Sequence, residues 1–192
     1  MKFFVNYVKQ FDTLVINWTN SIVNQTKTID NITLLYNNEQ IIGANIVNPD
    51  IDKSKTYYLE DVHLSAYAIE TLKPYFDLKE NEAQFIIAKV VECSPIEGTH
   101  LSLCKVFDGQ NELQIVCGAK NVRQELLTVL ATVGSFMPNG MQINPGKLKG
   151  HDSFGMLCSG KELNIGHIFD NQGIIEIEAN DALIGKRIWE VI

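Results

Sequence analysis

Apolar residues in the first fifty positions of the chain fall in short runs rich in β-branched and aromatic side chains. Such runs are typical of β-strands. Between two of them, Asn37-Asn38 has the composition of a tight hairpin turn. The runs predict strands over residues 3–8, 13–18, 33–36 and 40–43.

The spacing of apolar residues then changes. Leu64, Ala68 and Leu72 recur every fourth residue, which places their side chains on one face of a helix. Asp61 or Ser65 can cap the start of this helix, and the proline two positions after Leu72 is expected to end or kink it. Strands followed by a helix predict a small α+β domain at residues 1–82, whose role the sequence does not indicate.

Residues 83–192 have short strand-like runs separated by turn signals, and twelve of the thirteen glycines lie from Gly98 onward. Many short strands joined by glycine-rich loops are typical of a small closed barrel, because closure removes exposed sheet edges. We therefore expect a mainly β protein, with a domain boundary near residues 80–82. The predicted strands of the barrel cover residues 85–91, 101–107, 112–117, 127–131, 141–143 and 174–177.

The composition is that of a folded chain, with 45% hydrophobic and 20% charged residues. No apolar run approaches the roughly 18 residues that cross a bilayer, and the start of the chain lacks the apolar segment of a signal peptide. We therefore expect a cytoplasmic protein without membrane contact. The net charge of −7 counts against strong binding to nucleic acid. The acidic surplus, however, lies outside residues 89–161, whose net charge is +1.

The four cysteines, at positions 93, 104, 117 and 158, include no Cys-x-x-Cys pair, so no metal site is predicted. Two disulfides are an alternative for a secreted protein, but without an export signal the sequence favours buried, reduced thiols. The histidines fall in no nucleophile or metal pattern, and no glycine-rich phosphate loop precedes a helix. The sequence predicts no catalytic residue, no cofactor and no small-molecule substrate.

Two segments carry the candidate chemistry. Residues 113–122 combine a strand with an abrupt polar turn, at which Gly118 lets the backbone bend and Asn121 can hydrogen-bond the backbone across the bend. In residues 147–163, Lys147 and Lys149 point the same way if the segment is extended, and lysines can position a phosphate backbone.

Neutral groups accompany these lysines. Ser153, Ser159 and the backbone of Gly155 offer hydrogen-bonding groups, and Met156 is a flexible apolar side chain on which bases can pack. The alternative interpretation of the same residues is structural: a solvated strand and a tight loop, with Met156 and Leu157 in the core.

The ten residues from Leu113 to Val122, Leu-Gln-Ile-Val-Cys-Gly-Ala-Lys-Asn-Val, resemble a motif of the tRNA-binding domain at the N-terminus of the bacterial phenylalanyl-tRNA synthetase β-chain. This OB-type module also occurs in methionyl-tRNA synthetase tails and EMAP-II-like proteins. Residues 134–143, 147–163 and 173–185 are similar to its later motifs, in the same order. A small α+β domain ahead of such a module resembles the layout of stand-alone bacterial YtpR-type proteins.

The chain departs from the family pattern at two places. The loop Ser94–Leu101 is one residue longer than usual and carries Glu97, which puts contacts from that loop in doubt. Lys120 stands where proline is usual and adds a positive charge near the turn.

The resemblance implies an OB-fold at residues 83–192 and a non-catalytic protein that binds tRNA by its backbone and shape. An alternative is a chaperone-like or protein-interaction module that uses the same barrel face. Stand-alone relatives are often homodimers, and joining two modest sites raises avidity. The candidate RNA-binding residues are Lys120, Asn121, Arg123, Lys147, Lys149, Ser153, Gly155, Met156, Ser159 and Lys161.

Overall fold

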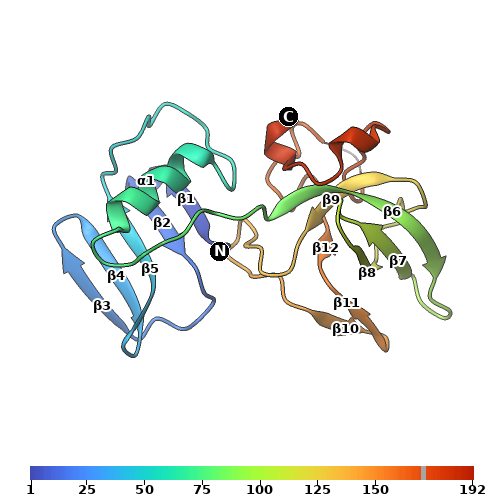
Figure 1. Cartoon of the computed structure of the whole chain (residues 1–192), viewed down its shortest axis with the longest axis horizontal. Coiled ribbons are helices and arrows are strands. Elements are labelled where there is room, and N and C mark those ends of the chain that lie inside the picture. The colour runs from blue at the N-terminus through green and yellow to red at the C-terminus, as the bar shows by residue number, and fades with distance from the viewer. Residues whose placement is uncertain (170–171) are drawn as a thin grey trace. The chain divides into compact units, whose positions relative to one another are not determined.

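The computed structural model describes residues 1–169 and 172–192. The chain forms two compact units, Met1–Ala83 and Gln84–Ile192, each built around its own antiparallel sheet (Figure 1). The protein is mainly β, which confirms the predicted fold class. The division into two separately folding domains near residue 82 stays a prediction.

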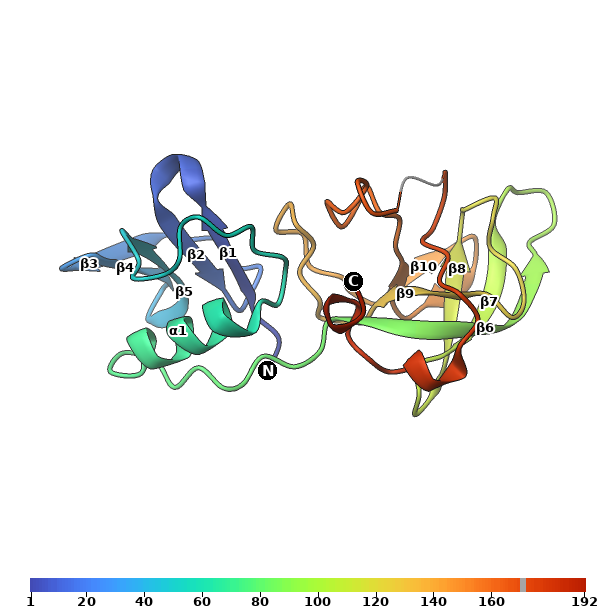
Figure 2. The same cartoon turned by 90° about the horizontal axis from the view of Figure 1, so that it is seen from above.

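The first unit is a five-stranded antiparallel sheet with the strand order β1-β2-β5-β4-β3. One helix, α1 (Val62–Leu72), lies across one face of this sheet (Figure 2). A short 3₁₀ turn joins the first two strands at Lys9–Phe11. The strands are β1 (Phe4–Val8), β2 (Thr13–Asn17), β3 (Gln25–Ile29), β4 (Ile32–Asn37) and β5 (Gln40–Val47).

The core of the first unit lies between α1 and the sheet. Leu64, Ala68 and Leu72 of the helix are buried, as their spacing predicts, against Leu14 and Ile16 of β2. Alternate residues of each strand face this layer, because side chains point to opposite faces of a sheet with period two.

The start of α1 shows which of the two expected caps is used. The Asp61 carboxylate accepts hydrogen bonds from the backbone N–H groups of His63 and Leu64, at 2.9 and 3.0 Å. The helix ends at Leu72, ahead of Pro74, as predicted. The sequence analysis missed strand β3, because its residues are polar and almost fully exposed. Backbone pairing with β4, rather than apolar burial, defines this edge strand.

The second unit contains the curled sheet expected of an OB-like barrel, with the strand order β12-β9-β6-β7-β8. A separate hairpin of β10 and β11 precedes β12. The strands are β6 (Phe85–Pro95), β7 (Ser102–Phe107), β8 (Glu112–Cys117), β9 (Leu127–Ala131), β10 (Gly146–Leu148), β11 (His151–Ser153) and β12 (Met156–Leu157).

One segment joins the two edges of this sheet. Residues 156–157 pair with β9 at one edge. Just before them, the Phe154 N–H donates to the Gln114 carbonyl (2.9 Å), and the Gln114 side chain donates to the Asp152 carbonyl (2.8 Å) at the other edge. The five residues of β9 are all buried, because this strand lies inside the sheet with both faces covered.

Two predicted strands of the barrel are not regular strands. Residues 141–143 form no regular strand. Gln142 makes one isolated antiparallel bridge, to Phe136. Ile175 donates to the Cys158 carbonyl, whereas Ile177 donates to the Leu127 carbonyl. Hydrogen bonds that alternate between two neighbours build no continuous ladder, so the apolar residues at 174–177 are buried without forming a strand.

The end of the chain covers the first half of β6. The 3₁₀ turns Asp181–Leu183 and Ile188–Glu190 lie against this strand, and the rings of Phe85 and Trp189 meet edge to face at 5.9 Å. This cover explains why the first four residues of β6 are buried on both faces. Among the residues that the structure describes, no helix has the length and apolar character needed to span a bilayer.

Candidate functional site

The turn after β8 is attached to a distant part of the barrel by Asn121. The side chain of Asn121 accepts a hydrogen bond from the Ile174 N–H (3.1 Å) and donates to the Ile174 carbonyl (2.9 Å) and to the Glu176 carboxylate (2.9 Å). Gly173 approaches so closely that a Cβ there would meet the Asn121 amide. Asn121 therefore bonds the closing segment of the barrel, and its polar atoms are engaged within the protein.

Arg123 completes this cluster. Its guanidinium lies 2.7 Å from the Glu176 carboxylate and also donates to the Asn121 carbonyl. The hydrogen bonds from Arg123 and Asn121 lower the pKa of Glu176 to about 2. Much of the charge of Arg123 is therefore balanced locally.

Replacing Glu176 with glutamine tests this cluster through its pH dependence. Because the pKa of Glu176 is lowered in the folded state, its stabilising effect is present above the ordinary carboxyl pKa and is lost as the pH falls toward 2. The pair is exposed and screened, so we expect a loss of at most about 1 kcal/mol at pH 7 in Glu176→Gln. The difference between wild type and variant, measured by urea unfolding, should shrink between about pH 5 and pH 2.

Glu178 provides the matched control, because it is exposed and has no ion-pair partner among the described residues. A Glu178→Gln variant should follow the wild-type stability across the same pH range. Equal behaviour of the two variants would contradict the assigned role of Glu176.

Ser153 and Gly155 hold the barrel together ahead of β12. The Ser153 hydroxyl accepts from the Val116 N–H (3.1 Å) and donates to the Gly155 carbonyl (3.4 Å), and Ser153 is only 5% exposed. Gly155 has φ 135°, and a Cβ there would lie 2.9 Å from the Ala131 carbonyl oxygen. Both residues therefore position β12, and direct RNA contact by either one stays a prediction.

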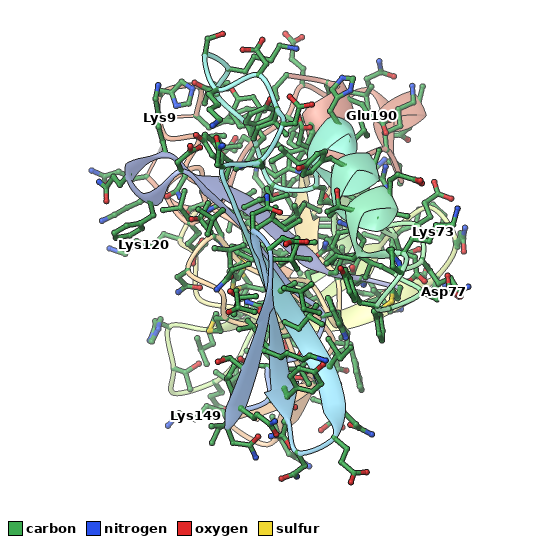
Figure 3. All side chains as sticks on the ribbon, turned by 90° about the vertical axis from the view of Figure 1, so that its left-hand side faces the viewer. Lys9, Lys73, Asp77, Lys120, Lys149 and Glu190 are labelled. Atoms are coloured by element: carbon green, nitrogen blue, oxygen red, sulfur yellow. The ribbon has the colours of Figure 1, made fainter. Side chains whose placement is uncertain are left out.

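Lys147 and Lys149 lie on the β10–β11 hairpin. Lys147 is in β10, but Lys149 has φ 49° and forms the turn with Gly150. The condition under which Lys147 and Lys149 would point the same way, an extended segment, is not met at Lys149, because the hairpin reverses there. Both side chains are exposed, and Figure 3 shows Lys149 and Lys120 extending outward into solvent.

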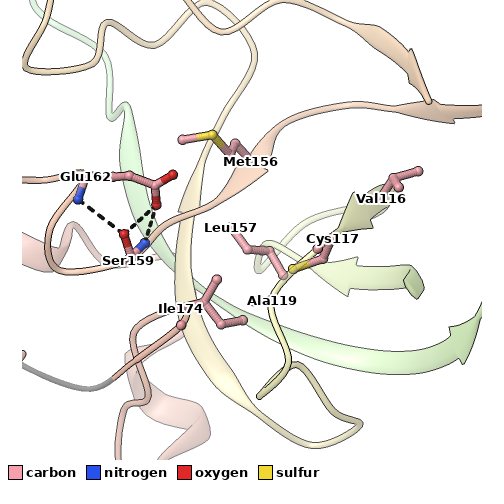
Figure 4. Close-up of a pocket in the computed structure, with 10 residues that line it drawn as sticks. Val116, Cys117, Ala119, Met156, Leu157, Ser159, Glu162 and Ile174 are labelled. Atoms are coloured by element: carbon pink, nitrogen blue, oxygen red, sulfur yellow. Dashed lines mark hydrogen bonds between the residues drawn. The ribbon is translucent and has the colours of Figure 1, made fainter. Parts of the chain in front are cut away.

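Met156 lies where two hollows of the barrel surface meet. The first has a volume of about 400 Å³ and is bordered by Cys117, Gly118 and Ala119, with Ser159 and Ile174 opposite. The second has a volume of about 460 Å³ and lies beside residues 137–141, Lys161 and Asn164. Met156 and Glu162 line both hollows, which we together call the Met156 groove, and Figure 4 shows the first of the two.

The acidic side chain in the Met156 groove is held by Ser159. The Glu162 carboxylate accepts from the Ser159 N–H (2.7 Å) and hydroxyl (2.6 Å), and the Glu162 N–H donates back to that hydroxyl (3.2 Å). Figure 4 shows these bonds beside the Met156 side chain. Because this carboxylate is negative, a phosphate is disfavoured at the centre of the groove.

The basic side chains of the barrel fall into two classes. Lys89 pairs with Glu125 and Asp181, and Lys105 pairs with Glu92 and Glu112. In contrast, no described acidic side chain forms an ion pair with the exposed residues Lys120, Lys149 and Lys161. Lys147 is only loosely paired, 3.8 Å from Asp152. Among the candidate residues, these four lysines are the ones available to an external anion. Lys186, outside the candidate set, is also exposed and has no described ion-pair partner.

The structure adds apolar residues that the sequence analysis did not select. Leu148 is 46% exposed on the hairpin, Phe154 is 41% exposed just after it, and Met141 is 49% exposed beside the groove. Glu162 was also not selected. The sequence signal that could have identified them is that Leu148 and Phe154 are large apolar residues within a short polar stretch that contains lysines. Their exposure, however, depends on the tertiary structure and cannot be read from this pattern.

Within residues 1–169 and 172–192, no group of three or more His, Cys, Asp or Glu side chains is arranged to hold a metal ion. The four thiols are free, and three of them are buried. Burial raises the pKa of the Cys104, Cys117 and Cys158 thiols, which keeps them protonated.

Comparison with known proteins places this unit among tRNA-binding domains. Residues 85–185 match the family model described as "Putative tRNA binding domain". An uncharacterized protein of Mycoplasma pneumoniae is 49% identical over 108 residues, which are 56% of this chain and 45% of that protein. The phenylalanine–tRNA ligase beta subunit of Ehrlichia canis is 46% identical over 104 residues, 53% of this chain.

These matches cover only parts of the relatives. The aligned region spans 45% of the Mycoplasma pneumoniae protein and 48% of an uncharacterized protein of Mycoplasma genitalium, which is 50% identical over 112 residues. It spans 13% of the ligase beta subunit of Ehrlichia canis. The family match lies within Gln84–Ile192, the unit that contains the Met156 groove and the β10–β11 hairpin.

Proposed function

This chain belongs to the tRNA-binding domain family, and from that premise we propose that it is a non-catalytic RNA-binding protein that holds tRNA by its backbone and shape. The OB-like barrel is the binding module. The observation that carries the proposal is the set of four available lysines together with the partly apolar Met156 groove, which Lys161 lines, all within the matched region.

The distribution of charge around the groove supports a particular mode of contact. Lysines neutralise phosphates from the rim, where Lys161 lines one hollow and Lys120 directly follows Ala119, which lines the other. The Glu162 carboxylate inside the groove repels phosphate but accepts hydrogen bonds from base amino groups. The RNA backbone therefore follows the rim, and an unstacked base or ribose contacts Met156.

The ion pairs of the barrel explain how a chain with a net charge of −7 can bind the negatively charged RNA. The acidic side chains beside Lys89, Lys105 and Arg123 balance those cations within the protein, whereas the four available lysines keep their charge for a ligand. Each phosphate neutralised on RNA contributes about −0.7 to −0.9 to the slope of log K against log salt. With four contacts we expect a slope of about −3 and weak affinity at physiological salt.

A titration of the full chain with bulk tRNA across salt concentrations tests the proposal. Filter binding or a mobility-shift assay should detect a complex at low salt, and its affinity should fall roughly 50-fold between 50 and 200 mM salt. Absence of a complex at low salt with high micromolar protein would contradict RNA binding. A tight complex with a protein partner that scarcely depends on salt would instead support the protein-interaction module.

Three further features complete the proposal. The protein acts in the cytoplasm, carries out no catalysis and uses no cofactor. A homodimer would bring two such sites to one RNA and raise avidity without new contacts. Light scattering at two protein concentrations, with and without tRNA, distinguishes a monomer from this dimer.

A further inference from the structure

Cys93 and Cys104 face each other across strands β6 and β7. The two residues are directly opposed in the antiparallel register, and their Sγ atoms lie 3.7 Å apart. Directly opposed residues on antiparallel strands have Cα atoms about 4.5–5.5 Å apart, within the span of a disulfide. The sulfurs need to approach by only about 1.7 Å to bond, without a change in strand register.

We propose that Cys93 and Cys104 form a reversible cross-strand disulfide when the protein meets a peroxide, so that this pair is an oxidation site in the barrel. Cys93 is partly exposed, and Cys104 is 1% exposed behind it. The oxidant therefore reaches Cys93 first, and Cys104 is the resolving thiol.

The reaction balances with one hydrogen peroxide molecule. The Cys93 sulfur attacks one peroxide oxygen, and the O–O bond breaks to leave a sulfenic acid and one water. The Cys104 sulfur then attacks the Cys93 sulfur, and the S–S bond forms as the S–OH bond breaks. The departing hydroxide takes the Cys104 proton as a second water. Two thiols are oxidised, and one peroxide is reduced to two waters.

Strand register favours Cys93 over Cys117 as the partner of Cys104. Cys117 lies opposite Ser102 on β7, and Cys104 lies opposite Ile115 on β8. Cys104 and Cys117 are therefore diagonal neighbours, for which the separation of about 7–8 Å exceeds the span of a disulfide. Cys158 is fully buried after β12. Cys93 and Cys104 are the pair of cysteines that the described strand register places directly opposite each other.

Two contacts set the expected behaviour of this pair. Burial, and then the neighbouring Cys93, raise the pKa of the Cys104 thiol, so the resolving step should be faster at higher pH. The Cys93 Sγ also lies 3.9 Å from the Val122 carbonyl, next to the turn that carries Lys120. Oxidation removes the S–H group that faces this carbonyl.

The test treats the full chain with hydrogen peroxide and follows intact mass and labelling by N-ethylmaleimide. The expected product is lighter by about 2 Da, has lost two of its four reactive thiols under denaturing conditions, and regains them with dithiothreitol. Glu97 lies between the two cysteines, so a glutamate-specific protease yields two peptides that stay joined only if Cys93 and Cys104 are linked.

Variants make the assignment specific. Cys93→Ser, at the partly exposed position, should abolish the mass loss, whereas Cys117→Ala should leave it unchanged. A linkage that includes Cys117 or Cys158, a disulfide only between two chains, or oxygen addition at Cys93 without linkage would each overturn the proposal. Because the assay reads thiols alone, its outcome is independent of whether the protein binds tRNA.

Discussion

Replacing Gly155 with alanine is expected to lower the free energy of unfolding by about 2–4 kcal/mol. Gly155 has φ 135°, a conformation that side chains with a Cβ rarely adopt. The added Cβ would also lie 2.9 Å from both the Ala131 carbonyl oxygen and Leu130 Cδ1. Backbone strain and overpacking therefore act together at the junction of β12 and β9.

Gly150 is the matched control for this substitution. It also has positive φ, 87°, but no atom lies within 4 Å of a Cβ built there. Gly150→Ala should cost only about 1 kcal/mol, so the difference between the two variants reports the close approach at Gly155. Urea unfolding gives both values, and amide exchange at Cys158, which donates to the Val129 carbonyl, localises the effect. Equal losses would show that contact with β9 is unimportant.

Replacing Lys147 and Lys149 together with alanine is expected to weaken tRNA binding roughly 10- to 50-fold near 0.1 M salt. The two lysines lie on the exposed hairpin, and only Lys147 has a described acidic neighbour, at 3.8 Å. Removing two phosphate contacts should make the slope of log K against log salt shallower by about 1.4–1.8. The loss should fade toward 1 M salt, where counterion release contributes little.

A second double variant separates local contact from net charge. Lys89→Ala with Lys105→Ala removes the same charge from the same unit, but both lysines are already paired with carboxylates, Lys89 with Glu125 and Asp181 and Lys105 with Glu92 and Glu112. This control should change the salt slope much less than the hairpin variant. If both variants shift the slope equally, the net charge of the chain rather than the hairpin governs binding. An unchanged curve for the hairpin variant would show that the RNA uses another face.

The local residue pattern was sufficient to predict those strands and the helix whose structure depends mainly on their own residues. The β-branched and aromatic runs predict most strands, and residues 127–131 match β9 at both ends. The helix and its end before Pro74 follow from spacing, and Asp61 was one of the two expected caps. Strand β3 was not predicted, because its residues are mostly polar and its backbone pairing with β4, rather than its own residue pattern, defines it.

The family was predictable from the sequence, but the structural roles of the candidate residues were not. The ordered motifs over residues 85–192 led to the family that the family model also matches. Asn121, however, bonds Ile174, 53 positions away, and Ser153 bonds the N–H of Val116, 37 positions away. No local periodicity encodes such pairings, so two residues selected as RNA-binding candidates have their polar groups engaged inside the barrel.

The sequence by itself determined the mainly β class, the helix and the tRNA-binding family, because these depend on neighbouring residues and ordered motifs. Only the tertiary structure decided which cations are available. Barrel closure places Glu176 beside Arg123 and leaves Lys120, Lys149 and Lys161 without a described acidic partner. Charge pairing depends on distances in space, and so the net charge of the chain did not predict which lysines lack a described acidic partner.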